Sequence, residues 1–353
     1  MNKKFNIISN SNCWIEHTAI EQLENISNLA HVTNALGLPD LHAGKIPVGI
    51  SVETADYVYP HLIGNDIGCG MSLFETSIKL KKYKETYFLH KLNSIKSLDQ
   101  IPLTKSYDNC PIENFGTIGA GNHFAEFQKI EKIYDNDEFE LSNIDKSKLF
   151  LLIHSGSRNF GTTIHNQFLN FAGITDQELE NYLVLHDQAL TWSSLNRTEV
   201  AKKLIGHLGY NDSLNSVVDC CHNYIEKRNN VFIHRKGTVS SENGLVIIPG
   251  SRGTLSYLVK PANDTAKSLF SLSHGAGRKW ARSLCYSRIK NKYSSKDLTS
   301  TRLGSKVICH DRNLLFQEAP EAYKNIEQVI HSLIDYNLIS IVATLRPLMT
   351  FKG

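Results

Sequence analysis

The spacing of hydrophobic and polar positions along the chain separates strand-like from helix-like stretches. Apolar residues alternate with polar ones, or run without a break, in segments that predict β-strands at 48–58, 71–78 and 149–153. The last of these leads directly into His154, so a buried strand would carry this histidine at its carboxyl end. Glycine-rich segments predict turns at 64–70 and 116–121.

Longer segments predict helices over 175–204, 214–228 and 320–336, and the second of them places apolar residues at helical spacing. Thr175 and Glu178 fit a capping box at the start of the first helix, and the second would place His222 on a helix. The segment 261–288 reads as a loop followed by a helix, with His274 near the helix start.

Three more short apolar runs complete the expected elements. Strands at 231–234 and 245–248 would flank a turn, and 339–345 would form a final strand. Strands and helices therefore mix without a regular βαβ period, which predicts an α+β (irregular α/β) fold and not a Rossmann fold. We see no repeat, low-complexity tract or obvious linker, so we expect a single catalytic domain spanning 1–353.

Composition narrows the class of protein without deciding its function. The chain has 353 residues, of which 41% are hydrophobic and 21% charged, which is ordinary for a water-soluble globular protein. Its formal net charge of +3 permits an anionic partner but does not require one. Basic clusters at 79–82 and 282–292 are either solvated faces or a path for a nucleic-acid backbone.

The sequence shows no targeting signal and no disulfide framework. No apolar run approaches the roughly 20 residues of a membrane span, and the N-terminus does not resemble a signal peptide. The seven cysteines are scattered and odd in number, which favours a reducing, cytoplasmic location over a disulfide framework. Most are expected to be buried, with Cys69 the exception because glycines on both sides could leave its sulfur accessible.

His274 lies in a segment suited to phosphate chemistry. The sequence SHGAGR at 273–278 places two glycines and Arg278 after the histidine. Glycines allow a close approach of backbone to phosphate, and an arginine can hold a phosphate through two parallel hydrogen bonds. The imidazole could then attack phosphorus and form a covalent intermediate. The alternative is a helix start with an incidental histidine.

A second group of residues offers metal ligands. Oxygen, sulfur and nitrogen donors recur beside glycine or asparagine or at a strand end, at Asp66, Cys69, His123, His154 and His222. Such a mixed set suits a divalent ion such as Mn, Zn, Fe or Co, and a thiolate can bridge two ions. Taken singly, each histidine could be a satisfied polar residue. A structural zinc site is the intermediate reading, although paired C-x-x-C spacings are missing.

The loop 249–256 follows an expected strand and offers backbone N–H groups and hydroxyls to a base or phosphate, or is simply a tight turn. Neither a Walker A motif nor a G-x-S-x-G nucleophile elbow occurs in the chain.

Taken together, these segments resemble the RtcB-type RNA ligases, a GTP- and manganese-dependent family that joins RNA ends. GNDIGCGM at 64–71, HSGSRNFG at 154–161 and SHGAGR at 273–278 are three of the matching motifs. The others follow in family order and lie at 39–44, 116–126, 222–223, 234–237, 249–256, 318–320, 322–324, 345–347 and 352–353.

The resemblance implies an RtcB-like fold with the active site in a central cleft. His274 would be the nucleophile that takes GMP from GTP. Cys69 would bridge two Mn²⁺ ions, one also held by Asp66 and His123, the other by His154 and His222. The implied guanylate-binding residues are Asn122, His123, Phe124, Glu126, His222, Asn223, Pro249, Gly250, Ser251, Arg252, Ser256, His274, Gly275, Ala276, Gly277 and Lys352.

The implied substrates are RNA ends. A 3′-phosphate, or a 2′,3′-cyclic phosphate after opening, would be activated as RNA–pp–G and attacked by a 5′-hydroxyl, in RNA repair or tRNA splicing. Glu126 would prefer guanine over adenine, and Lys352 would bring a positive donor to the nucleotide. The implied protein partner is release-factor-like or otherwise activating, and no membrane is involved.

The chain also departs from the family pattern. It is shorter than many members, as in a compact branch, Arg252 stands where the family often has Met, and 279–281 differ. These departures leave the metal and nucleophile positions intact but put the RNA preference in doubt. A metal-dependent phosphoesterase without guanylylation and a non-catalytic RNA-binding protein are the competing interpretations.

Overall fold

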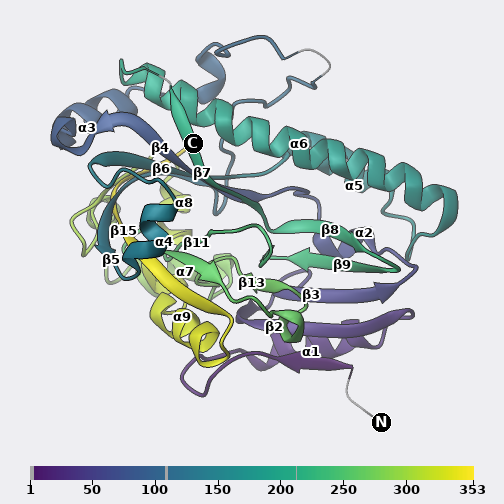
Figure 1. The fold of residues 1–353 in the computed structure, drawn as a ribbon. Coiled ribbons are helices and arrows are strands. Elements are labelled where there is room, and N and C mark those ends of the chain that lie inside the picture. The colour runs from purple at the N-terminus through teal and green to yellow at the C-terminus, as the bar shows by residue number, and fades with distance from the viewer. Residues whose placement is uncertain (1–3, 108–109, 212) are drawn as a thin grey trace.

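The computed structural model of the chain describes residues 4–107, 110–211 and 213–353. Helices and strands are intermixed along the chain, so the predicted α+β fold is confirmed. An eight-stranded sheet and a five-stranded sheet form the framework, and a two-stranded ribbon joins them. Helices lie against both sheets, and the N-terminal strands lie at the opposite end of the molecule from α6 (Figure 1).

The eight-stranded sheet has the order β11-β12-β15-β5-β6-β4-β7, with β14 paired to β15. Neighbouring strands are antiparallel except β14 and β15, which are parallel. Its strands are β4 (Gly70–Lys79), β5 (Phe124–Ile133), β6 (Lys148–Ser155), β7 (Leu214–Cys221), β11 (Val246–Ile248), β12 (Ser256–Pro261), β14 (Lys306–Cys309) and β15 (Ile339–Lys352).

The five-stranded sheet has the order β1-β2-β3-β9-β8 and receives the chain directly from β7. Its strands are β1 (Phe5–Ile7), β2 (Val32–His42), β3 (Val48–Ala55), β8 (Asn223–Arg228) and β9 (Val231–Lys236). The ribbon consists of β10 (Thr238–Ser240) and β13 (Ser271–Ser273).

Nine α-helices occur within the described residues, and the longest, α6, runs along one side of the large sheet (Figure 1). They are α1 (His17–Ser27), α2 (Pro60–Ile63), α3 (Glu85–Asn93), α4 (Asn136–Leu141), α5 (Arg158–Gln167), α6 (Asp176–His207), α7 (Arg282–Ile289), α8 (Arg312–Gln317) and α9 (Ile326–Asp335).

The core lies on both faces of the large sheet. Along β6, Phe150 and Leu152 belong to one buried cluster, whereas Leu149, Leu151 and Ile153 belong to another. Successive side chains of a strand point to opposite faces, so a strand that is covered on both sides needs an unbroken apolar run. This explains the pattern at 149–153 and fixes His154 at the end of a buried strand.

The helix predicted over 214–228 is wrong. The segment forms β7 and β8, and His222 lies between them. Its apolar residues fit a helical spacing on paper, but the burial along β7 alternates at its C-terminal end, where Val218 and Cys220 are buried and Asp219 is exposed. Pairing of β7 with β4 satisfies the backbone and overrides the local pattern.

The expected helix start at His274 is also wrong. His274 follows β13, and α7 begins only at Arg282. Thr175 is the N-cap of α6 as predicted, but it makes no capping hydrogen bond within the described structure and instead donates to Asp176. The strands at 231–234 and 245–248 exist but belong to different sheets, separated by β10.

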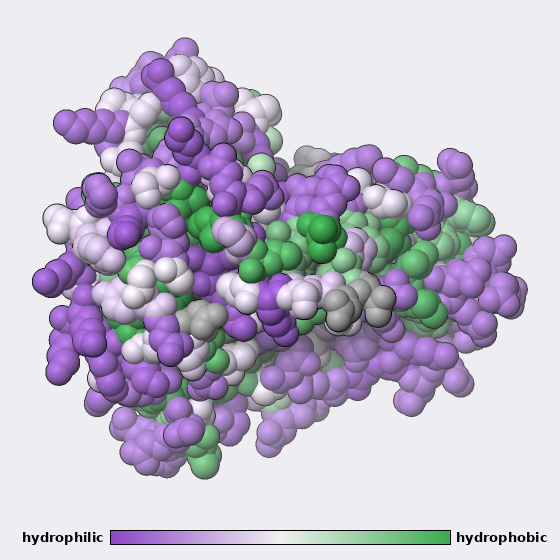
Figure 2. All heavy atoms as spheres, turned by 90° about the horizontal axis from the view of Figure 1, so that it is seen from above, coloured by the Kyte–Doolittle hydropathy of each residue, from purple (hydrophilic) through white to green (hydrophobic). Residues whose placement is uncertain are grey.

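Two predicted elements have different limits. The final strand runs on to Lys352, and the expected helix 320–336 is a 3-10 turn at Pro320–Ala322 followed by α9. Hydrophilic side chains cover most of the face seen in Figure 2, with smaller hydrophobic patches between them. Of the helices that the structure describes, none is long and apolar enough to span a membrane.

Candidate active site

Four adjacent strands of the large sheet, β5, β6, β4 and β7, bring candidate ligands to one edge. Gly70 at the start of β4 pairs with Ser155 on one side and with Cys221 on the other. Phe124 at the start of β5 pairs with His154. This register places Cys69, His123, His154 and His222 next to one another although they are distant in sequence.

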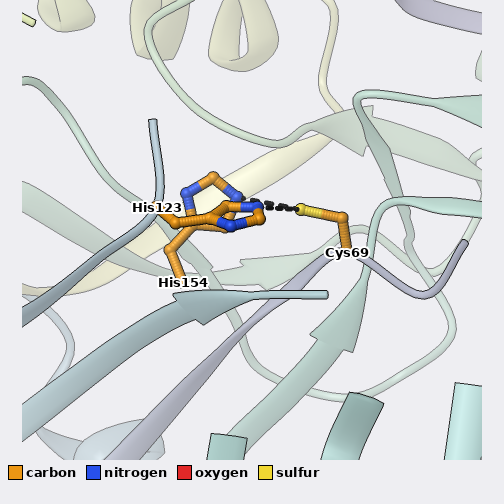
Figure 3. Close-up of side chains that lie close together, drawn as sticks. All are labelled: Cys69, His123 and His154. Carbon is orange, nitrogen blue, oxygen red and sulfur yellow. Dashed lines mark hydrogen bonds between the residues drawn. The ribbon is translucent and has the colours of Figure 1, made fainter. Parts of the chain in front are cut away.

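The sulfur of Cys69 is the centre of this group. It lies 3.2 Å from Nε2 of His123 and 3.2 Å from Nε2 of His154, and both rings point toward it (Figure 3). Asp66 Oδ2 lies 3.0 Å from His123 Nε2, and His222 Nε2 lies 3.3 Å from His154 Nε2. The five residues therefore form two sets that share the sulfur.

The ring of His154 is oriented to present a lone pair and not a proton to this centre. His154 Nδ1 donates to the carbonyl oxygen of Asn122 at 3.2 Å, which leaves Nε2 of the neutral ring as an acceptor. Burial, followed by neighbouring histidines, lowers the pKa of His154 and of His222 well below the ordinary value. Both rings are therefore neutral at pH 7 and able to bind a cation.

Asp66 carries a negative charge at this centre, whereas Cys69 gains one only when a cation binds. Burial would raise the pKa of Asp66, but the adjacent His123 holds it below its ordinary value. Burial and then Asp66 raise the pKa of the Cys69 thiol well above its ordinary value. A bound divalent cation would reverse this effect on the thiol, because a coordinating thiol is deprotonated.

The donor set fits a metal centre. Within the described residues, the ligand atoms of Cys69, His123 and His154 lie within 4.8 Å of one another, and all three residues are buried. Over the same residues, the buried Oδ1 of Asp66 has no hydrogen-bond partner. Unpaired buried carboxylate oxygens are costly, so a cation at this point would relieve the cost.

His274 stands beside the metal-ligand group with a different partner. Its Nδ1 lies 2.7 Å from Oδ2 of Asp40, and its backbone N–H also donates to this oxygen at 3.2 Å. Asp40 is fully buried. The ring centroids of His274 and His222 are 4.7 Å apart, so the nucleophile candidate adjoins the His154–His222 set.

Gly277 explains how the His274 segment reaches Asp40. Its φ is +69°, and a Cβ at this position would lie 2.3 Å from the carbonyl oxygen of Asp40. Only glycine tolerates both the backbone conformation and the close approach. Gly277 therefore allows close packing against Asp40 on β2, and this packing holds the ring of His274 in place.

A buried polar network surrounds Glu126 on β5. Its carboxylate accepts from Gln128 Nε2 at 2.7 Å and from the hydroxyl of Thr350 on β15, and burial raises its pKa to about 7. Gln128 also donates to Ser256 Oγ at 2.9 Å. Ser256 is thus linked to Glu126 through Gln128 and does not itself line the cavity.

Lys352 closes the cavity from the end of β15. Its Nζ donates to the carbonyl oxygens of Gly121 and His123, both at 3.1 Å, and Glu318 lies 3.9 Å away. Burial lowers the pKa of Lys352 to about 8. The lysine therefore braces the turn that carries His123, with one further N–H left for a ligand.

One cavity of about 350 Å³ unites these groups. Except for Ser256, every site residue predicted from the sequence lines it; these are Asp66, Cys69, Asn122, His123, Phe124, Glu126, His154, His222, Asn223, Pro249, Gly250, Ser251, Arg252, His274, Gly275, Ala276, Gly277 and Lys352.

Two expectations need correction. Cys69 is only 4% exposed, so its sulfur faces the cavity but is not freely accessible. Arg278 lines the cavity, but its guanidinium donates to Glu318 Oε1 at 3.0 Å and to the carbonyl oxygens of Gln317 and Trp280. It is therefore committed to protein partners and is not free to hold a phosphate by two parallel hydrogen bonds.

The most important residue that sequence reasoning missed is Asp40. It was visible only as part of the matching segment 39–44, and nothing marks it locally as the partner of a histidine 234 residues away. Thr350, Glu318 and Lys236 also line the cavity, and sequence reasoning assigned them no role. Their roles follow from the sheet register and side-chain contacts, which no local motif encodes.

Comparison with known proteins agrees with this geometry. A family model described as tRNA-splicing ligase RtcB matches residues 22–105, 89–204 and 169–353. The chain belongs to the RtcB family. RNA-splicing ligase RtcB2 of Escherichia coli (strain ATCC 25922) is 40% identical over 363 residues, covering 98% of this chain and 95% of the relative.

Other RtcB relatives are more distant but span nearly the same length. RNA-splicing ligase RtcB of Escherichia coli (strain K12) is 26% identical over 417 residues, covering 96% of this chain and 95% of the relative. tRNA-splicing ligase RtcB of Nanoarchaeum equitans is 26% identical over 450 residues, covering 96% of this chain and 92% of the relative. The resemblance drawn from the RtcB motifs is thus confirmed.

Proposed function

We propose that this protein is a GTP-dependent RNA ligase that joins an RNA 3′-phosphate or 2′,3′-cyclic phosphate to a 5′-hydroxyl, with residues 1–353 acting as one catalytic domain. One observation carries the proposal. The Asp40-held ring of His274 lies 4.7 Å, centroid to centroid, from His222, a member of the cation-ligand group. Membership of the RtcB family and the printed names of the relatives support it.

His274 is the proposed nucleophile, through Nε2. Because Nδ1–H donates to Asp40, the lone pair of the neutral ring is on Nε2. Attack on the α-phosphorus of GTP forms an N–P bond and breaks the α–β P–O bond, so pyrophosphate leaves. The ring gains positive charge in this step, and the buried Asp40 carboxylate stabilises it.

Two cations would be held by the sets Asp66–Cys69–His123 and Cys69–His154–His222, as the shared sulfur suggests. Manganese is the proposed ion, because the mixed oxygen, nitrogen and sulfur donors suit a borderline divalent metal and the family resemblance implies it. When bound, the ions would neutralise phosphate charge and orient the reacting oxygens.

Guanine recognition is assigned to Glu126. In its ionised form this carboxylate has acceptor capacity beyond its bonds to Gln128 and Thr350. It can accept from the N1–H and N2–H₂ groups of guanine, whereas adenine has no N1–H to offer. Lys352 would place its remaining N–H and positive charge near the nucleotide.

The two RNA steps take place at two different phosphorus atoms, first that of the guanylate and then that of the RNA 3′-phosphate. An oxygen of the RNA 3′-phosphate attacks the guanylate, the N–P bond breaks and His274 returns to its neutral form. The 5′-hydroxyl next attacks the RNA phosphorus, losing its proton to a base, and GMP leaves. A 2′,3′-cyclic phosphate first needs hydrolysis to the 3′-phosphate.

Labelling with α-labelled GTP and Mn²⁺ tests the proposal. Wild-type protein should retain acid-labile label, and His274→Ala should retain none. An RNA 3′-phosphate and a 5′-hydroxyl RNA should then be joined with GTP and Mn²⁺ but not with ATP. Release of phosphate from RNA without any protein label would favour the phosphoesterase alternative and overturn the ligase.

The proposed biological setting follows from thiol chemistry and from the family resemblance. A reducing, cytoplasmic location suits a cavity that depends on the free thiol of Cys69. The release-factor-like or activating partner, and the choice between RNA repair and tRNA splicing, stay predictions from the resemblance.

A further inference from the structure

The long helix α6 carries an unusual set of polar residues on its buried side. Its C-terminal half lies between the large sheet and the segments 98–107 and 110–118 (Figure 1). Asn196, Arg197 and Glu199 are all fully buried, and Lys203 is 3% exposed. Burying such groups is costly unless each one is hydrogen-bonded, so their partners show what the helix is built to hold.

The partners of Arg197 are the chain neighbours of metal-ligand candidates. One nitrogen, Nη1, donates to the carbonyl oxygen of Gly68 at 2.9 Å and to that of Ser155 at 3.1 Å. Gly68 precedes Cys69, and Ser155 follows His154. A single buried guanidinium thus holds together the two backbone segments that carry Cys69 and His154.

The other nitrogens of Arg197 extend this contact to β7. Nη2 donates to Asp219 Oδ1 at 2.7 Å and lies 3.7 Å from the sulfur of Cys221, the residue before His222. Nε donates to Ser72 Oγ at 2.7 Å, and Ser72 donates to Asp219. All three nitrogens are therefore used on β4, β6 and β7, whose ends carry Cys69, His154 and His222.

Asn196 on the same helix continues the pattern to the turn before β5. Its Oδ1 accepts from the Gly116 N–H at 2.7 Å, and its Nδ2 donates to the carbonyl oxygen of Thr117 and to Ser155 Oγ. The polar side of α6 therefore faces the backbone that supports the candidate metal centre.

We infer that Arg197 is a positioning residue for the metal centre, which fixes the spacing of Cys69, His154 and His222 through their neighbouring backbone. The inference rests on the proposed function, because it presumes that these residues bind cations. Lysine cannot replace Arg197, since one ammonium cannot reach acceptors on three strands in a fixed planar geometry. Residues that orient ligands typically change metal affinity by about 10–100-fold when altered.

Arg235 on β9 provides a matched control. It is also fully buried, and its guanidinium donates to Ser271 Oγ, to the Tyr224 hydroxyl, to Glu226 and to the carbonyl oxygen of Phe270. None of these partners is next in the chain to a metal-ligand candidate. Arg235→Lys should therefore reduce stability as Arg197→Lys does, without the same effect on metal binding.

Cobalt titration of the full chain, without GTP or RNA, tests the inference. The near-ultraviolet thiolate-to-cobalt absorption band reports coordination by Cys69, and Cys69→Ser gives the signal without sulfur. We expect Arg197→Lys to weaken Co²⁺ binding at least about tenfold and to change the band. Arg235→Lys should stay within about twofold of wild type, with a comparable fall in melting temperature.

The possible outcomes separate the two proposals. Wild-type-like Co²⁺ binding by folded Arg197→Lys overturns the positioning role and leaves the ligase proposal intact. A wild-type protein without the band overturns the metal centre and this inference together. If Arg197→Lys does not fold, Asp219→Asn decides instead, because it removes the carboxylate partner of Arg197 and should weaken Co²⁺ binding severalfold; unchanged affinity overturns the inference.

Discussion

The two halves of the cavity hold their imidazoles in different ways. In the metal half, the Nε2 atoms of His123 and His154 converge on the Cys69 sulfur, and the Nδ1 of His154 faces a backbone carbonyl. In the nucleotide half, His274 has the buried carboxylate of Asp40 at its Nδ1. The metal half thus presents the neutral imidazoles of His154 and His222 to a cation, whereas the other half supports a ring that becomes positive.

This contrast assigns roles to histidines that are alike in sequence. A carboxylate on the far nitrogen stabilises an imidazolium, as a nucleophile requires. Burial and then neighbouring histidines disfavour protonation of His154 and His222, as a cation site requires. Substitutions in one half, with both GMP labelling and metal binding measured, test this contrast.

The largest effect is expected from Cys69→Ser. Loss of the shared sulfur should remove metal binding and reduce GMP labelling of His274 by about 10²-fold or more, the scale for loss of a main electrostatic stabiliser. Metal content by mass spectrometry and labelling by GTP check both parts. Full labelling at low Mn²⁺ would show that the halves do not cooperate through this sulfur.

Asp40→Asn should give the next largest effect. The amide keeps the shape but removes the charge that stabilises the ring of His274, so we expect labelling to fall about 10²-fold or more. Metal affinity should stay near wild type, because Asp40 contacts none of the ligand candidates through an observed hydrogen bond in the described residues. Normal labelling by this variant would show that His274 needs no carboxylate.

Glu126→Gln should reduce discrimination between nucleotides. The amide replaces one acceptor by a donor, so the guanine edge loses a match, and we expect the preference for GTP over ATP to fall about tenfold or more. Competition labelling with both nucleotides measures the ratio. An unchanged ratio would place guanine recognition elsewhere in the cavity.

Titration of Glu126 and of Lys352 should shape the pH profile of guanylylation, with smaller effects than the substitutions above. The ionised form of Glu126 is lost as pH falls through about 7, and the charge of Lys352 is lost as pH rises through about 8. Labelling should therefore be greatest between these values. Glu126→Gln should flatten the fall in labelling on the acid side of the profile, and Lys352→Arg should flatten the fall on the alkaline side. If the profile of either variant matches that of the wild type, a different group controls that side.

Removal of the last two residues should have the smallest effect. It deletes Lys352, whose Nζ braces the carbonyl oxygens of Gly121 and His123. We expect guanylylation to weaken severalfold, mainly through a higher GTP requirement, as for loss of hydrogen bonds from a charged donor. Labelling of the shortened chain at the wild-type rate would argue against this role.

The sequence predicted correctly those elements whose residue pattern fits only one type of secondary structure. The apolar run at 149–153 is β6, and the helix predicted over 175–204 is most of α6. The segment 214–228 was misread because its spacing fits a helix equally well, and only pairing with β4 decides for strand. His222 was nevertheless named as a ligand candidate, and it lines the cavity, since a ligand type can be recognised without its backbone conformation.

Residues of the candidate site could be predicted where they lie in short sequence motifs. They could not be predicted where their role depends on tertiary contacts. The motifs at 64–71, 154–161 and 273–278 contain Asp66, Cys69, His154 and His274. Asp40 and Arg197 lie outside any local pattern that signals their contacts. Their roles depend on which strands become neighbours, which is a property of the whole sheet.

Diffraction from crystals grown with Mn²⁺ and GTP tests the contrast between the halves most directly. Anomalous scattering should give two manganese peaks, one on each side of the Cys69 sulfur and roughly 3.5–4 Å apart. Density for GMP should be continuous with Nε2 of His274 while Nδ1 stays on Asp40. A single peak away from the sulfur, or GMP bonded to any other residue, would contradict the account.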